Sequence, residues 1–174
     1  MRAFVTLTST LAVLLLARSA LAQQATEPLH FSKLIPLLPD KVAGFVAEKA
    51  QGSTSAAMGF KVTEVSRTYH KDSEDSEHTV TVKITDGTGN QFFNAAYAAM
   101  PQFSNESTDG YEKGFPLDGN PATERYNTDN KYGSLTVFLA GRYLVQIDIN
   151  GLDPKTMQEW WKKIEVKKLA ELKS

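Results

Sequence analysis

Alternating hydrophobic and polar residues predict an antiparallel hairpin near the end of the chain. In "YGSLTVFLAGRYLVQIDING", residues 132–151, apolar residues alternate, stop at Gly141 and then alternate again. Period-two alternation is typical of strands with one buried face. Glycine adopts a positive φ without steric cost, which suits the tight turn between two such strands.

A second hairpin is predicted from "FKVTEVSRTYH" and "HTVTVKITD", residues 60–70 and 78–86, which flank an acidic turn. The apolar and large residues of its first strand change phase part of the way along. Such a change favours a β-bulge. The residues in the two phases are Phe60 and Val62, then Val65, Arg67 and Tyr69.

Helical spacing occurs in two further segments. A run that starts at Phe31 predicts one or two helical turns, because Pro36 and Pro39 prevent a longer helix. Between the two hairpins, aromatic and apolar residues recur at i, i+4 and i+7 and predict a helix ended by a proline. We interpret this stripe as packing; it consists of Phe93, Tyr97 and Met100, with Pro101 after it.

The last segment carries a helix start signal. Asp153 is suited to cap a helix and Pro154 to occupy its first position, while Leu152 and Met157 can pack together as a hydrophobic staple. An apolar stripe at helical spacing continues toward residue 172. Its members are Met157, Trp160, Trp161, Ile164, Leu169 and Leu172.

Residues 103–121 are rich in Asn, Ser, Thr, Asp, Gly and Pro, which predicts a long loop with one short strand at residues 110–115. Grouped strands with helices between the groups indicate the α+β class. We therefore expect an antiparallel β-sheet flanked by helices, in a single-domain sandwich over residues 23–174.

Residues 1–22 have the pattern of a cleavable signal peptide. Arg2 precedes an apolar run, and Ala20 and Ala22 form a small-residue cleavage pattern, so we expect cleavage after Ala22. The apolar run is shorter than the ~20 residues of a membrane-spanning helix. No other segment is apolar enough to span a bilayer.

The composition limits the cellular compartments and the classes of partner that fit this protein. The chain has no cysteine, which excludes disulfides and thiolate chemistry and favours the periplasm over a eukaryotic secretory route. Without Arg2 and Arg18, 17 of its 19 basic residues remain beside 20 acidic ones. So mild a charge gives no electrostatic basis for binding nucleic acid.

The order of elements resembles the small extracytoplasmic proteins of the PsbP/Mog1/DcrB-like fold. The features that carry the resemblance are "EVSRTYH", "HTVTVKITD", the helix after them, "GSLTVFLAGRYLVQIDI" and "MQEWWKKIEVKKLAEL". The likeness covers residues 34–172 as topology and spacing. It implies an antiparallel sheet flanked by helices and a binding or accessory role, and it transfers no functional residue.

Metal binding is a local hypothesis for the acidic hairpin tip. His70 and His78 bracket "KDSEDSE", in which Asp75 and its neighbours offer oxygen donors. Neutral imidazole suits a divalent transition metal such as zinc, copper or nickel. The alternative is a solvated acidic tip, and the segment lacks a compact ligand spacing. Otherwise no cofactor is indicated.

Catalytic motifs are absent from the sequence, which has no G-x-S-x-G, S-x-x-K or H-E-x-x-H pattern. A carboxylate-dependent hydrolase stays open as an alternative, because two acidic residues could meet in the fold. The candidates are Asp109, Glu112, Asp118 and Glu124. We expect a protein that is not an enzyme.

Arg142 and three aromatic residues are the candidates for binding. Arg142 follows the turn glycine, where it can pair with Glu124 or Asp148 or clamp a ligand carboxylate or phosphate. The predicted loop carries aromatic residues that either touch a partner or pin the loop to the core; they are Phe103, Tyr111 and Phe115. We expect a periplasmic binding or accessory protein whose partner is an envelope protein or a small ligand.

Overall fold

Most of the chain forms antiparallel β-sheet. The computed structural model describes residues 27–57, 59–98 and 102–172. Among the described residues, strands account for 48% and short helices for 19%. The sheet is larger, and the helices are shorter, than the sequence pattern indicates. The predicted signal peptide, Met100 and Pro101 lie outside the described residues.

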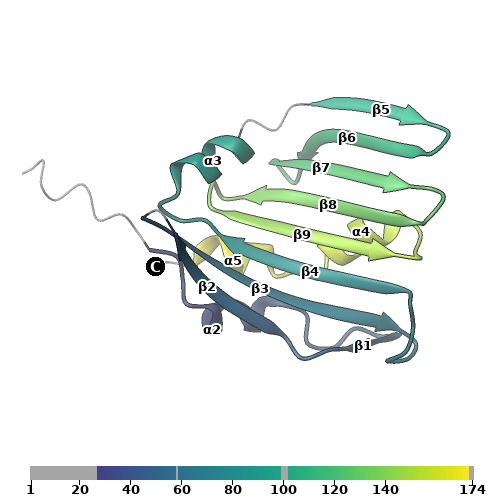
Figure 1. The fold of residues 1–174 in the computed structure, drawn as a ribbon, viewed down its shortest axis with the longest axis horizontal. Coiled ribbons are helices and arrows are strands. Elements are labelled where there is room, and N and C mark those ends of the chain that lie inside the picture. Colours follow the sequence, from purple (N-terminus) through teal and green to yellow (C-terminus); the bar gives the residue numbers. More distant parts are fainter. Residues whose placement is uncertain (1–26, 58, 99–101, 173–174) are drawn as a thin grey trace, which may run out of the picture.

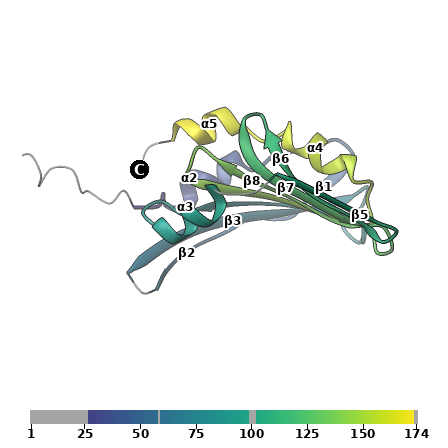
Figure 2. The same ribbon diagram turned by 90° about the horizontal axis from the view of Figure 1, so that it is seen from above.

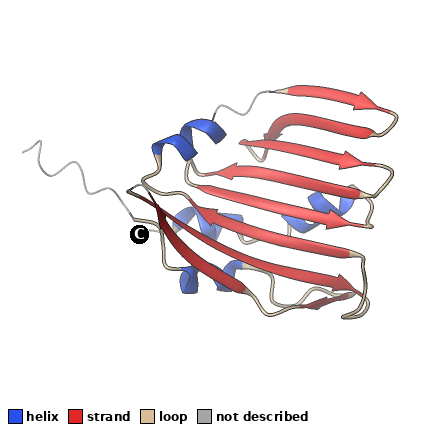
Figure 3. Ribbon diagram, viewed as in Figure 1, coloured by secondary structure: helices blue, strands red, loops and turns tan. Residues whose placement is uncertain are grey.

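Nine strands form one sheet in the order β1-β3-β4-β9-β8-β7-β6-β5, with β2 also paired to β3 (Figures 1 and 3). Every neighbouring pair is antiparallel. β1 and β2 therefore share one edge of the long strand β3. The strands are β1 (Phe45–Ala47), β2 (Gln51–Ala57), β3 (Phe60–Lys71), β4 (Thr79–Asp86), β5 (Phe103–Ser107), β6 (Gly110–Leu117), β7 (Asn120–Asn127), β8 (Tyr132–Leu139) and β9 (Tyr143–Asn150).

Both predicted hairpins are present, as β3–β4 and β8–β9. At the β8–β9 turn the amide of Arg142 donates to the carbonyl of Leu139 over 3.1 Å. Ala140 and Gly141 both have positive φ, 54° and 64°. Two central residues of positive φ give a type I′ turn, whose twist matches that of the flanking strands.

The helices are short and lie mainly on one side of the sheet; Figure 2 shows α4 and α5 along that side. Pro36 limits the first helical segment to α2 and a 3-10 turn, η1, as predicted. The helices are α2 (Phe31–Leu34), η1 (Ile35–Leu37), α3 (Gln91–Ala98), α4 (Lys155–Trp161) and α5 (Val166–Glu171). No helix within the described ranges has the length and apolar character needed to cross a membrane.

The predicted terminal helix is two helices. Residues 162–165 interrupt it, and Glu165 has non-helical dihedral angles, φ −76° and ψ 61°. The helix starts one residue later than expected, at Lys155 with Pro154 as its N-cap, but the Asp153 carboxylate still accepts a 3.0 Å hydrogen bond from the amide of Lys155. Leu152 and Met157, the predicted staple, are both buried.

The main core lies between the sheet and the helices α2, α4 and α5. One alternate set of strand residues points into it, and we call this side the covered face. Trp160 of α4 contacts Tyr69 at 4.5 Å and Phe45 at 5.1 Å between ring centroids. The strand residues of this core include Val65, Tyr69, Val80, Val82, Ile84, Leu135, Val137, Leu139, Tyr143, Val145, Ile147 and Ile149.

Two expectations about the strands are wrong. The register of β3 is continuous against both β2 and β4, so the predicted bulge is absent. Phe60 and Val62 lie on the other face instead. The segment predicted as a long loop, residues 103–121, forms β5, β6 and the start of β7, and of that prediction only the short strand expected at residues 110–115 is present, as part of β6. Its Gly and Pro residues occur within and between strands, whose pairing satisfies the backbone despite a polar sequence.

Helix α3 lies on the opposite side of the sheet, which we call the open face. Phe93 and Tyr97 contact Phe138 of β8, with ring centroids 6.3 Å and 6.0 Å away. Phe138 follows Val137 in the strand and therefore points away from the main core. Phe93 and Tyr97 therefore pack at one end of the open face and not in the main core, where the sequence had placed the stripe.

Candidate functional site

The open face is polar over its centre. In an antiparallel sheet with one buried face, the alternate residues on the other face are free to be hydrophilic. Here they carry hydroxyl, amide and charged groups on four adjacent strands. They are Thr79, Thr81 and Lys83 of β4, Gln146 and Asp148 of β9, Ser134 and Thr136 of β8, and Thr123 and Arg125 of β7.

A hollow of about 260 Å³ lies on this face. Strands β6 to β9 form its floor, and α3 contributes one residue at its rim. It is lined by Tyr97, Glu112, Thr123, Arg125, Ser134, Thr136, Leu144 and Gln146. The sequence had selected only Glu112 among them, and as a possible hydrolase carboxylate rather than a ligand-binding residue.

The strand register arranges the lining residues in three rows. The charged row runs Glu112, Arg125 and Ser134, each opposite the next on adjacent strands, and Asp148 continues it on β9 beyond the lining residues. The second, uncharged polar row runs Thr123, Thr136 and Gln146. In the third row Leu144 lies opposite Phe138, beneath α3. The hollow therefore changes from charged to apolar along the strands.

Arg125 differs from the other arginines of the described ranges. Arg67 pairs with Asp40 at 3.0 Å, and Arg142 pairs with Asp86 at 2.7 Å. Arg125 forms no ion pair within 4.0 Å in this part of the chain, although Glu112 lies opposite it on β6. Glu112 has no ion pair there either. The hollow thus contains one cation and one carboxylate without an ion pair in the described ranges, although the Tyr132 hydroxyl contacts Arg125.

Two neighbours orient the charged row. The Gln146 amide donates to both carboxylate oxygens of Asp148, over 3.0 Å and 2.9 Å. The hydroxyl of Tyr132 interacts with Arg125 and Asp148. Burial, followed by the charge of Asp148, raises the pKa of Tyr132, and Arg125 opposes that rise. Tyr132 therefore stays protonated and can donate to Asp148.

Arg142 is engaged in contacts within the protein. Its guanidinium donates to both oxygens of Asp86, over 3.0 Å and 2.7 Å, and to the carbonyl of Leu172 over 3.1 Å. The predicted partners Glu124 and Asp148 are wrong; the partner is Asp86, 56 residues earlier. Asp86 is fully buried and also accepts from the amide of Leu29. Arg142 therefore joins the β8–β9 turn to both ends of the described chain.

The contacts of Asp86 shift the pKa of its carboxyl group. Burial alone would raise the pKa of the carboxyl group. The hydrogen bonds from Arg142, Thr88 and the Leu29 amide outweigh burial and lower the pKa below its ordinary value. Asp86 is therefore ionised, and its negative charge balances that of Arg142.

The three aromatic residues selected from the sequence do not form one surface. Phe103 is 37% exposed on β5, and its register places it on the open face. Tyr111 lies on the covered face and donates to Glu124 over 2.6 Å. Phe115 packs against the core. The predicted aromatic binding loop is therefore replaced by one exposed ring and two packed ones.

Glu124 is buried at 2% exposure and is held by three donors on the covered face. Besides Tyr111, Lys113 pairs with it at 3.0 Å, and Gln158 of α4 donates to it over 3.0 Å. Burial, and then the hydrogen bond to Glu124, raises the pKa of Tyr111 well above its usual range. This network fixes α4 to the sheet, and it leaves Glu124 without a free acid–base role.

The predicted metal ligands are not brought together. His70 has Glu48 Oε1 at 2.6 Å from Nε2 and the carbonyl oxygen of Ser76 at 2.9 Å from Nδ1. His78 lies next to Gly151 and not beside His70. Asp75 acts on His70 through its charge alone. Across the described ranges, no group of three His, Asp or Glu side chains is arranged to hold a metal ion.

His70 is suited to carry a proton on both nitrogens, because each faces an acceptor. The hydrogen bond with Glu48, and then that with Ser76, raises its pKa. It borders a hollow of about 360 Å³ with Val46, Ala47, Glu48, Lys49 and Glu74. The imidazole and the Glu48 carboxylate of that hollow already satisfy each other.

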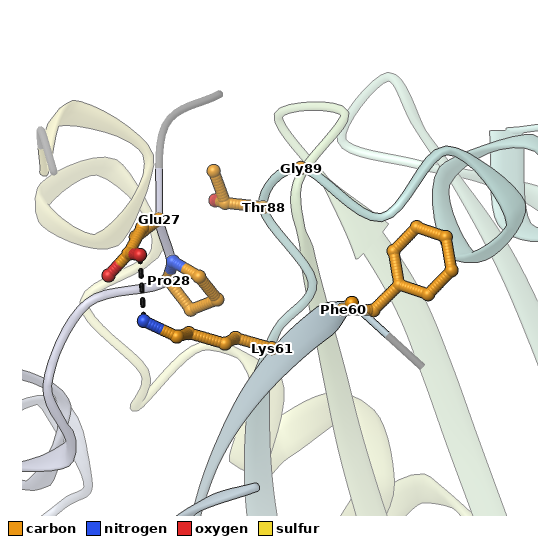
Figure 4. A pocket seen from close by; sticks show the side chains of 7 residues that line it. Glu27, Pro28, Phe60, Lys61, Thr88 and Gly89 are labelled. Carbon is orange, nitrogen blue, oxygen red and sulfur yellow. Dashed lines mark hydrogen bonds and ion pairs between the residues drawn. The ribbon is translucent and has the colours of Figure 1, made fainter. Parts of the chain in front are cut away.

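A smaller hollow of about 140 Å³ lies where the start of β3 approaches the segment after β4 (Figure 4). Glu27 and Lys61 form an ion pair of 2.7 Å across it. Thr88 and Gly89 lie on its far side, and the ring of Phe60 points away. Its two charged groups pair with each other, and it is smaller than the hollow of the open face, which is therefore the stronger candidate of these two.

Comparisons with protein-family models, with curated proteins and with solved structures gave no match to this chain. The case for the site therefore depends on its own geometry. The sequence did contain one usable signal, because alternation in "PATERYNT" places Thr123 and Arg125 on the same face. It did not contain the register that brings Glu112 opposite Arg125.

Proposed function

We propose that the chain is a non-enzymatic binding protein of the periplasm that holds a small polar ligand in the hollow of the open face. The observation that carries this proposal is the combination of unpaired Arg125 and Glu112 at one end with Leu144 and Tyr97 at the other. Small-molecule sites typically combine apolar walls with a few polar groups that fix the orientation of the ligand. The resemblance to extracytoplasmic binding proteins agrees with this role.

The lining chemistry favours binding over catalysis. The hydroxyls of Ser134 and Thr136 are weak nucleophiles without an adjacent general base, and no histidine lines the hollow. Hydroxyl, amide, guanidinium and carboxylate groups together suit hydrogen bonding to a polar molecule. A volume of about 260 Å³ is just below the range of roughly 300–1,000 Å³ found for drug-sized ligands, which favours a smaller one.

Export and domain organisation are parts of the same proposal. The mature chain would begin at Gln23 and fold as one α+β domain in which helices flank the sheet. N-terminal sequencing of protein from the periplasmic fraction should give a start at Gln23. A chain that keeps Met1 there would contradict cleavage. A single cooperative unfolding transition is expected of one domain of this size.

Blocking the hollow tests the binding function. Thr136→Trp places an indole at its centre, whereas Ser55→Trp places one on β2, on the same face but outside the hollow. Purified mature protein is incubated with a small-molecule extract of the cell envelope, desalted and analysed by native mass spectrometry. A ligand mass retained by the natural chain and by Ser55→Trp should be lost from Thr136→Trp. Retention of every ligand by Thr136→Trp would contradict the proposal.

A further inference from the structure

We propose that the ligand is a small zwitterion, an amino acid with an apolar side chain, whose carboxylate binds Arg125 and whose ammonium binds Glu112. This inference rests on the proposed function and specifies its ligand. The two side chains come from directly opposed positions on β7 and β6. Side chains opposed in an antiparallel pair have Cβ atoms about 4.5–5.5 Å apart. Both can therefore reach one small molecule.

The charged residues of the hollow fit a zwitterion better than a ligand that carries a single charge. An acid without an amine would meet Glu112 beside Arg125 and Asp148 two strands away, and both would repel it. An amine without an acid would meet the Arg125 guanidinium. A zwitterion gives each charge a partner of opposite sign. Guanidinium also binds carboxylate through two parallel hydrogen bonds, which fixes orientation.

The other rows suit the rest of such a ligand. Thr123 and Thr136 offer hydroxyls beside the charged row, and the carbonyl oxygen of Gln146 is available because its amide nitrogen is engaged with Asp148. Beyond them, Leu144 and the Tyr97 ring form an apolar end beneath α3. With its charged end at Arg125, an amino acid can place an aliphatic side chain there.

Three related molecules test the carboxylate and the ammonium of the ligand separately. L-leucine carries both groups, 4-methylpentanoate is leucine without the amine, and 3-methylbutylamine is leucine without the carboxylate. Calorimetric titration of the mature protein should give an affinity for L-leucine at least about tenfold above that for either analogue, a difference of about 1.4 kcal/mol. Equal affinity for 4-methylpentanoate would overturn the role of Glu112. Equal affinity for the amine would overturn that of Arg125.

Variants assign the effect to the two residues. Arg125→Gln and Glu112→Gln should each weaken L-leucine binding about tenfold or more, because each leaves one ligand charge unpaired. Lys155→Gln and Glu106→Gln make the same changes of net charge at exposed positions outside the hollow, and they should bind as the natural chain does. The double variant Arg125→Glu with Glu112→Arg restores opposite charges and should recover part of the binding, which a merely structural role would not predict.

The outcomes separate this inference from the proposed function. Absence of L-leucine binding, with a ligand still lost from Thr136→Trp, would overturn the zwitterion and leave the binding function in place. Absence of any ligand that depends on the hollow would overturn both. Unchanged thermal midpoints of the two single variants would show that lost binding does not reflect unfolding.

Discussion

The two faces of the sheet treat charge in opposite ways. On the covered side, buried carboxylates have full sets of donors: Glu124 has Tyr111, Lys113 and Gln158, and at the end of the sheet Asp86 has Arg142. Leaving such groups unpaired in a low-dielectric interior would be costly. On the open face, Arg125 and Glu112 are exposed, so neither needs an ion-pair partner. The same strands therefore build a core on one side and can leave binding groups free on the other.

The largest stability effect is expected at the buried ion pair. Asp86→Ala removes the carboxylate that holds Arg142, Thr88 and the Leu29 amide. Removal of one partner of a buried pair typically lowers the free energy of unfolding by about 3–5 kcal/mol. Urea unfolding at neutral pH measures the loss. A loss below about 1 kcal/mol, which is ordinary for surface pairs, would contradict the contrast between the faces.

The contribution of the Asp86–Arg142 pair to the free energy of unfolding depends on pH. Because the folded-state pKa is lowered, the stability from this group is present above its unfolded value of 3.8. It is lost as the pH falls below that value toward the folded pKa. Asp86→Ala should therefore show a weaker loss of stability over that acid range than the natural chain.

A core truncation comes next. Met157→Ala removes a fully buried side chain of α4 from between the helix and the sheet. Such substitutions typically lower the free energy of unfolding by about 2–5 kcal/mol, because a cavity is left behind. The measurement is the urea midpoint with an unchanged slope. A shift no larger than that of an open-face variant would show that the covered face does not dominate stability.

On the open face, loss of a charge should hardly affect folding. Arg125→Gln should change the free energy of unfolding by no more than about 0.5 kcal/mol, as is usual for surface substitutions. The same urea series as for Met157→Ala provides the comparison. A loss of 2 kcal/mol or more, within the range of about 1–3 kcal/mol for buried polar partners, would show that the contact of Arg125 with Tyr132 is structural. It would also weaken the assignment of Arg125 to a ligand.

The smallest effect is expected at His70, which follows the open-face alternation of β3. Its folded pKa is raised, so the stabilisation from its contacts with Glu48 and Ser76 is present below the unfolded value of 6.5 and is lost as the pH rises through the folded value. His70→Gln should remove this slope while leaving acid-range unfolding unchanged. An NMR titration of the imidazole should give a pKa above 6.5. A lower value would contradict the two hydrogen bonds.

The sequence predicted the residues of the covered face better than those of the open face. Alternation in β4, β8 and β9 identified core residues directly, because one buried face produces a period of two. Strand β5 was missed, and β6 was predicted only as a short strand at residues 110–115. Every residue of β5 is exposed, and β6 contains Gly114 and Pro116, so neither carries that alternation. In both cases pairing with a neighbouring strand determined the structure.

The candidate site was less predictable, since it depends on the register of four strands. Glu112 and Arg125 are opposed only through the β6–β7 pairing, and Ser134 and Asp148 only through β8 and β9. Likewise, Asp86 reaches Arg142 across 56 residues. Local spacing cannot specify such contacts. Local spacing instead predicted sites at Arg142 and at the acidic hairpin tip. In the fold, Arg142 pairs with Asp86 and His70 pairs with Glu48.

The central claim is that ligand binding occurs on the open face, around Arg125. A titration of ¹⁵N-labelled mature protein with L-leucine, followed by NMR, tests it most directly. We expect the Arg125 Nε resonance and the backbone amides of Glu112, Thr136 and Gln146 to move together and to saturate, with the amides of α4 unchanged. Shifts confined to other regions, such as the His70 hollow, or no saturating shift at all, would contradict it.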